Sequence, residues 1–266
     1  MKVHHLDCGP MQPLVVGRLV CHVLLCETAS GLVLVDSGMG LADIAEPARR
    51  LGPLRRLLQP SSDPLTTAVR QIEALGFEAA DVRDIVLTHL DLDHVGGIAD
   101  FPAARVHVTA TEHAAATAPA LRERSRYRQV QWDHHPRFVT YAEPGEPWRG
   151  FAAAQPVDGL DERFALVPMP GHSRGHACVA VDTEERGWLL HAGDAVFDGS
   201  MLSGGSAPRR ALRTFERMVA FDLAQVRANH ERLAELQARE GAAVHVLPAH
   251  DPTQLRRAQA AAERSN

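Results

Sequence analysis

The chain has 266 residues, of which 45% are hydrophobic and 23% charged, with a formal charge of −5 at pH 7. This composition can bury one large core, so we expect a single domain over residues 1–266. The weak negative charge argues against nucleic acid or an anionic membrane surface as a partner. We see no apolar run long enough for a membrane span or a signal-peptide core, and therefore expect a cytoplasmic protein.

Apolar runs at residues 15–26 and 31–36 predict two neighbouring strands, joined by a turn at Thr28–Gly31. Further along the chain, periodicity and capping residues predict strands that alternate with helices. We expect strands at 84–88, 105–109, 164–168, 177–181, 187–191 and 244–248, and helices at 63–75, 112–117, 208–239 and 252–263. The pattern is that of an α/β protein.

Polar residues with metal-binding chemistry stand just behind several of these predicted strands. They are Asp36, His89, His172, Asp194 and His250. Because side chains at the ends of successive strands can converge on one edge of a sheet, we expect them to form one site. Each histidine alone is more often an ordinary loop or core residue, and we assign no role to the histidines without such a context. The four cysteines form no C-x-x-C pair and receive no role either.

The densest cluster is VLTHLDLDHVGG at residues 86–97, which places two histidines and two aspartates within six positions. Neighbouring carboxylates repel each other unless a positive charge lies between them, and neutral imidazoles are good ligands for divalent cations. The segment therefore predicts a metal site.

Five segments in chain order, LVLVDSG, THLDLDH, PGHSRGH, HAGD and PAHD, resemble the ordered motifs of the metallo-β-lactamase superfamily. The resemblance runs from about Val15 to His250, and it is most similar to the N-acyl-homoserine lactonase-like branch. It implies an αββα sandwich of two mixed β-sheets flanked by helices, with a metal site at one edge. It also implies metal-activated hydrolysis as the commonest chemistry.

The superfamily motif H-x-H-x-D-H implies a dinuclear site when it is transferred residue by residue. Ligands of the first metal would be His89, Asp91 and His172, and those of the second Asp93, His94 and His250, with Asp194 bridging both. We expect two divalent ions, zinc first of all, sharing a hydroxide that acts as the nucleophile. Asp93 or Asp194 would help to move a proton. Asp36 would orient the metal-binding loop, and His176 would pack or form hydrogen bonds near the site without binding the metals. The alternative for Asp36 is a turn residue that ends a strand.

Asp91 departs from the usual motif, which has histidine at this position. A carboxylate is a harder, anionic ligand, so we expect this site to accept manganese or iron as well as zinc. The alternative is that Asp91 is a spectator.

Substrate contacts are expected from an aromatic and cationic stretch at residues 119–150, which we interpret as a lid insertion. Its candidates are Tyr127, Trp132, His134, His135 and Tyr141. Phe197 should also line the substrate site, where it replaces the tyrosine that the lactonase branch commonly carries, so a hydrogen-bond donor is missing. We expect Tyr127, Tyr141 or a histidine of the stretch to take its place, or lactone opening to be slow. The alternative for the stretch is a solvated helical hairpin.

These features predict a metal-dependent hydrolase that opens a lactone or cleaves a carboxylic ester or thioester of a small molecule. Two alternatives stay open: an iron-containing redox enzyme of the same fold, and a non-catalytic metal-binding or ligand-sensing module. A homodimer is also left open.

Overall fold

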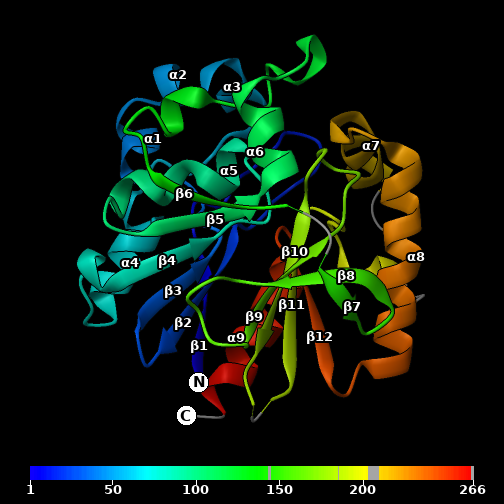
Figure 1. Cartoon of the computed structure of the whole chain (residues 1–266). Coiled ribbons are helices and arrows are strands. Elements are labelled where there is room, and N and C mark those ends of the chain that lie inside the picture. The colour runs from blue at the N-terminus through cyan, green and yellow to red at the C-terminus, as the bar shows by residue number, and fades with distance from the viewer. Residues whose placement is uncertain (143–144, 185, 203–209, 265–266) are drawn as a thin grey trace.

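Two six-stranded β-sheets form the centre of the molecule, and helices lie on their outer sides (Figure 1). The structure, a computed structural model, describes residues 1–142, 145–184, 186–202 and 210–264. Both sheets are mixed, since each contains parallel and antiparallel pairs. The expected αββα sandwich is confirmed.

The first sheet is built from the N-terminal half of the chain in sequence order. Its strands are β1 (Lys2–Asp7), β2 (His22–Thr28), β3 (Gly31–Val35), β4 (Val82–Val86), β5 (Arg105–Thr109) and β6 (Arg137–Tyr141). The first three are antiparallel neighbours, and β3 to β6 run parallel. Apolar residues fill β3 on both faces, as expected for a strand with a parallel neighbour that is covered on each side.

The second sheet has the spatial order β12-β11-β10-β9-β8-β7. Its strands are β7 (Glu146–Trp148), β8 (Phe151–Pro156), β9 (Phe164–Pro168), β10 (Ala177–Asp182), β11 (Trp188–Gly193) and β12 (Val244–Pro248). Only the β11–β12 pair is parallel among these neighbours.

The helices vary from single turns to 18 residues. They are α1 (Leu41–Ala45), α2 (Pro47–Arg50), α3 (Arg55–Leu58), α4 (Ala68–Ala74), α5 (Leu92–Val95), α6 (Ala110–Thr117), α7 (Arg210–Val219), α8 (Leu223–Glu240) and α9 (Pro252–Glu263). Asp222 and Asp251 begin α8 and α9 by accepting backbone hydrogen bonds from the first helical turn. None of the helices in the described ranges is long and apolar enough to cross a membrane.

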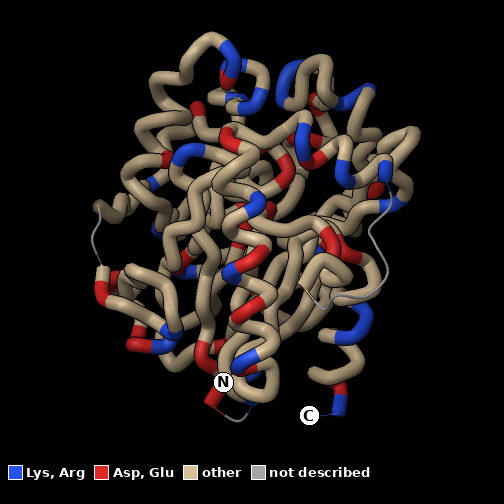
Figure 2. Tube along the Cα trace, turned by 90° about the vertical axis from the view of Figure 1, so that its right-hand side faces the viewer, with Lys and Arg blue, Asp and Glu red and all other residues tan. Residues whose placement is uncertain are grey.

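The core has separate layers between and outside the sheets. Val33 and Val86 of the first sheet pack with Phe164 and Val179 of the second in the central layer. The outer layers lie under α4 and α6 on one side and under α8 on the other. Acidic and basic residues are interspersed along the trace (Figure 2).

Several predicted elements have different boundaries in the structure. The strand expected over 15–26 begins only at His22, and residues before it form a loop in which Val15 is exposed. The helix expected over 63–75 is a 3₁₀ turn followed by α4. The helix expected over 208–239 is divided into α7 and α8, because Asp222 caps a new helix; positions 208–209 lie outside the described residues.

The stretch at 119–150 has two parts. Residues 121–131 contain two 3₁₀ turns. The later part forms β6, which joins the first sheet, and β7, which joins the second. Positions 143–144 of the expected lid lie outside the described residues. A lid interpretation is therefore confined to the part that precedes β6.

Candidate metal centre

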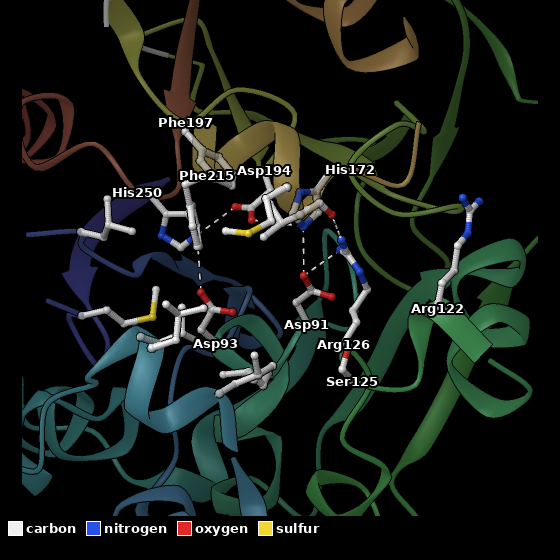
Figure 3. Close-up of a pocket in the computed structure, with 18 residues that line it drawn as sticks. Asp91, Asp93, Arg122, Ser125, Arg126, His172, Asp194, Phe197, Phe215 and His250 are labelled. Atoms are coloured by element: carbon white, nitrogen blue, oxygen red, sulfur yellow. Dashed lines mark hydrogen bonds and ion pairs between the residues drawn. The ribbon is translucent and has the colours of Figure 1, made fainter. Parts of the chain in front are cut away.

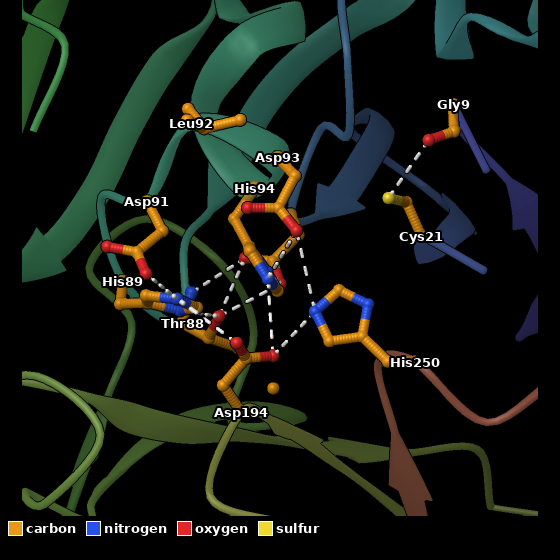
Figure 4. A network of polar contacts seen from close by, with 12 residues as sticks. Gly9, Cys21, Thr88, His89, Asp91, Leu92, Asp93, His94, Asp194 and His250 are labelled. Carbon is orange, nitrogen blue, oxygen red and sulfur yellow. Dashed lines mark hydrogen bonds and ion pairs between the residues drawn. The ribbon is translucent and has the colours of Figure 1, made fainter. Parts of the chain in front are cut away.

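The loops that follow β4, β9, β11 and β12 meet at one edge of the sandwich and bring all seven expected ligands together. Ligand atoms of His89, Asp91, His172 and Asp194 lie within 4.8 Å of one another, and those of His94, Asp194 and His250 form a second such group. Figure 4 shows Asp194 between the two groups. The architecture thus places groups from distant parts of the chain around a common centre.

Asp194 turns one carboxylate oxygen toward each group. Its Oδ2 lies 3.3 Å from Nε2 of His172 and 3.9 Å from Nε2 of His89. Its Oδ1 lies 3.0 Å from Nε2 of His250 and 3.3 Å from Nε2 of His94. This is the arrangement that a bridging carboxylate requires.

Several of these atoms are buried without a hydrogen-bond partner. They include Nε2 of His89, Nε2 of His94, Oδ1 of Asp91 and Oδ1 of Asp194. An unsatisfied buried polar atom is costly, and atoms of this kind gathered around one point are the donor set of a divalent cation. The residues present therefore fit metal ions.

The outward-facing imidazole nitrogens are held by the protein. Nδ1 of His94 donates to Asp36 at 2.8 Å, and Nδ1 of His250 donates to the carbonyl of Val20 at 2.7 Å. The hydroxyl of Thr88 donates to Asp36, so it accepts from Nδ1 of His89 at 2.9 Å. These contacts put protons on Nδ1 and leave the Nε2 lone pairs facing the centre.

Asp36 is a buried residue at the end of β3 with a left-handed backbone, φ 58°. Burial alone raises the pKa of its carboxyl, but the neighbouring His94 outweighs this effect, and the pKa is lowered to about 2. The structure thus places Asp36 as a charged support behind two expected ligands, where the sequence located it.

Asp91 points into the centre and not into solvent. Its Oδ2 lies 2.9 Å from Nε2 of His172 and 3.5 Å from Nε2 of His89. Asp93 belongs to the other half, where its Oδ2 lies 3.5 Å from Nε2 of His250. The two carboxylates of the LDLD segment therefore face different groups of ligands.

His176 lies next to the loop that carries Asp194. Its Nε2 accepts a hydrogen bond from the backbone N–H of Asp194 at 3.0 Å. This contact fixes the loop that carries the bridging carboxylate.

Two further residues contact this region and were not anticipated. Glu112 on α6 is fully buried and accepts hydrogen bonds from the backbone of Leu90 and of Gly175, which lie in two different ligand loops. Cys21 lies near Asp93, but its Sγ is turned toward the carbonyl of Gly9, at 3.2 Å (Figure 4). The sequence does not single out either residue, because a lone glutamate in a helix and an isolated cysteine are common without any function.

A cavity of about 190 Å³ opens beside the cluster (Figure 3). Its apolar lining includes Leu54, Leu57, Leu58, Phe215 and Met218. Its polar lining includes Asp91, Arg122, Ser125 and Arg126. The cavity therefore combines an apolar wall with the polar edge of the cluster, as small-molecule sites commonly do.

Phe197 lines this cavity, and its ring packs against the rings of His172 and His250 at centroid distances of 5.8 and 5.3 Å. The other expected substrate contacts, Tyr127, Trp132, His134, His135 and Tyr141, do not line it. Tyr127 instead donates to Glu112 from the core, whereas Arg122 and Arg126 of the same segment line the cavity.

Tyr141 lies on β6, where its hydroxyl contacts Nδ1 of His107 and accepts from the backbone of Asp158. Trp132 packs against the core under the first sheet. The expectation that a tyrosine or a histidine from residues 119–150 replaces the missing donor therefore has no support in the cavity.

A sequence profile of the metallo-beta-lactamase superfamily matches residues 16–250. Over 253 residues the chain is 50% identical to the probable metallo-hydrolase Rv2300c of Mycobacterium tuberculosis. The match covers 95% of this chain and 81% of Rv2300c. It is 30% identical to the N-acyl homoserine lactonase AttM of Agrobacterium fabrum, over 63% of this chain and 62% of AttM. It is 32% identical to the human acyl-coenzyme A thioesterase MBLAC2, over 64% of this chain and 56% of MBLAC2.

The fold is similar to that of solved lactonase structures. An AiiA variant from B. thuringiensis with N-decanoyl-L-homoserine bound superposes with a TM-score of 0.70 at 22% sequence identity. The match covers 96% of this chain and 95% of AiiA.

Proposed function

Because the chain belongs to the metallo-β-lactamase superfamily, we propose that it is a hydrolase with two divalent metal ions that opens a lactone or cleaves a carboxylic ester or thioester. The observation that carries this proposal is Asp194, whose two oxygens face two separate groups of ligands. A protein that held a single ion would not need this arrangement.

His89, Asp91 and His172 would hold the first ion, and Asp93, His94 and His250 the second, with Asp194 shared. Two divalent ions bound there would activate a water and polarise the carbonyl of the substrate. Imidazole and carboxylate ligands suit zinc, and the additional carboxylate of Asp91 makes the first site acceptable to manganese or iron.

The cavity supports an acyl substrate. Its leucines, together with Phe215 and Met218, offer an apolar wall for an acyl chain, which leaves the reacting carbonyl at the polar edge beside Asp194. Asp93 also borders the cavity, and its carboxylate would hold the proton released by the attacking water and pass it to the leaving group. AttM is a lactonase and MBLAC2 is a thioesterase, and these relatives support a lactone or a thioester as the substrate.

The test is a set of substrates that share one decanoyl group: a homoserine lactone, an aryl ester and a thioester, with a phosphodiester and a cephalosporin added. The protein is loaded with zinc, manganese or iron, and Asp194→Asn is the matched inactive variant. We expect metal-dependent hydrolysis of at least one acyl substrate and a loss of about 10³-fold or more in the variant. Failure to hydrolyse any of them at full metal occupancy would overturn the proposal and favour a non-catalytic binding module.

A further inference from the structure

Arg126 joins Asp91 to the end of α7. Its Nη1 donates to Oδ2 of Asp91 at 2.8 Å, and its Nη2 donates to the backbone carbonyl of Val219 (Figure 3). The side chains of Arg126 and Asp91 are only 13% and 16% exposed. The guanidinium is therefore held at two points, unlike that of an ordinary surface arginine, and its geometry is fixed.

The Asp91 carboxylate lies between this guanidinium and the metal cluster. Oδ2 faces Arg126 and also Nε2 of His172, at 2.9 Å. The second oxygen, Oδ1, is buried and has no hydrogen-bond partner. Oδ2 is thus the oxygen that faces both the arginine and the ligand cluster, and a cation bound beside His89 and His172 would share it with the guanidinium.

The charges of the pair compensate each other. In the motif that the chain resembles, position 91 is a neutral histidine, so the aspartate adds one negative charge to the first site. Arg126 adds one positive charge in direct contact with it. In a buried setting, where charges are weakly screened, the pair has the net charge of the imidazole that it replaces.

We propose that Arg126 is a positioning residue, and that Asp91 and Arg126 together replace the neutral histidine ligand of the first metal. This inference rests on the proposed function only in that it requires a metal at the first site. The same arginine connects that metal to Val219 and so to the wall of the cavity, which contains Val219 and Met218.

The test measures zinc binding by competition with a chromophoric chelator, in Arg126→Ala, Asp91→His and the double variant Asp91→His/Arg126→Ala. We expect Arg126→Ala to lower the affinity for one of the two zinc ions by about 10- to 100-fold, because groups that support metal ligands have effects of this size. The double variant should return to within about threefold of the wild type, since a neutral histidine needs no counter-charge. Asp91→His alone should bind zinc more weakly than the double variant, because Arg126 is then left as an unpaired cation beside the metal.

Arg128→Ala is the matched control. Arg128 lies in the same segment and donates to the backbone carbonyls of Arg49 and Arg50, away from the metal ligands. If Arg128→Ala loses as much zinc affinity as Arg126→Ala, then Arg126 only holds its segment in place, and the proposal is overturned. If Arg126→Ala does not fold, Arg126→Met keeps the length of the side chain without the charge or the hydrogen-bond donors and gives the same comparison.

Two other results would also overturn it: unchanged zinc affinity in Arg126→Ala, or a double variant as weak as Arg126→Ala. The readout does not depend on turnover. A protein that binds zinc as expected in all variants but hydrolyses no acyl substrate would refute the proposed function and leave the Asp91–Arg126 pair standing.

Discussion

The carboxylate of Asp36 lies 2.8 Å from Nδ1 of His94, on the side of the ring opposite to Nε2, which faces Asp194. Through the hydroxyl of Thr88 the same carboxylate also orients His89. One buried carboxylate thus sets the tautomer of two histidines, one in each group of ligands.

Replacement of Asp36 with asparagine should therefore weaken both metal sites. We expect a 10- to 100-fold loss of zinc affinity, about the effect of removing a carboxylate that supports a metal-bound histidine. Chelator competition measures this loss. Asp84→Asn is the control, because Asp84 contacts Nε2 of His107 at 2.7 Å in a similar pair remote from the metal ligands; equal losses in the two variants would contradict the assignment.

The Asp91→His variant should prefer zinc more strongly than the wild type does. A carboxylate suits manganese better than an imidazole does, so the ratio of manganese to zinc affinity should fall about tenfold. Because the ratio is taken within each protein, the effect of the unpaired Arg126 largely cancels. Identical ratios in the two proteins would mean that Asp91 is a spectator.

Phe197→Tyr should accelerate lactone opening. Phe197 lines the cavity between the rings of His172 and His250, and a phenol there would offer the donor that the cavity lacks at this position. We expect kcat/KM for a decanoyl lactone to rise about tenfold, the order of one transition-state hydrogen bond. Phe215→Tyr, on the apolar wall of the same cavity, should show no such gain; a gain in both variants would indicate a general effect of polarity.

Glu112→Ala should destabilise the protein and its metal centre together. Four donors, including the backbone of Leu90 and Gly175 and the hydroxyls of Tyr127 and Ser173, would lose their acceptor. Unsatisfied buried groups cost about 1–3 kcal/mol each, and partial hydration on relaxation should leave a net loss of about 3 kcal/mol in urea unfolding.

Glu216→Ala is the control for Glu112. Glu216 is buried against His230 between α7 and α8, so its removal should lower stability without a loss of zinc. Normal zinc content in both variants would show that Glu112 does not brace the ligand loops.

Asp100 should make stability depend on pH. The pKa of its carboxyl is raised from 3.8 to about 6, chiefly by burial and also by the charge of Asp43, against the opposing effects of the Leu41 backbone N–H and the charges of Arg50 and Arg70. The folded protein therefore binds this proton more tightly than the unfolded chain does. The resulting stabilisation is complete below the unfolded value of 3.8 and is lost as the pH rises through about 6.

Asp100→Asn tests this effect, because the amide oxygen can still accept from Leu41. The wild type should lose about 2 kcal/mol relative to the variant between about pH 4 and about pH 7, somewhat less than the full shift because Asp100 is only partly buried. Urea unfolding at both pH values measures the difference. Titration of the metal ligands is common to both proteins and cancels, so parallel pH profiles would contradict the assignment.

The positions of the expected ligands followed from the sequence because they depend on local patterns. An apolar run of five or six residues makes a strand, and the polar residue behind it must lie at the strand end, as His89 does after β4 and His250 does after β12. Since the strands belong to stacked sheets, these ends meet at one edge. The strand ends thus predicted that the expected ligands converge, and the resemblance of the ordered motifs to a known superfamily predicted the fold.

The direction of individual side chains outside regular structure was decided only by the tertiary fold. Arg126 and Tyr127 are adjacent in sequence, yet Arg126 reaches Asp91 at the cavity and Tyr127 is buried against Glu112. Their directions depend on the 3₁₀ turns at 121–131 and on what packs around them, which no periodicity encodes. Glu112 is the same case, because its partners come from loops far away in sequence. The sequence by itself thus determined which chemistry gathers at the sheet edge, and the packing of irregular segments determined which neighbours tune it.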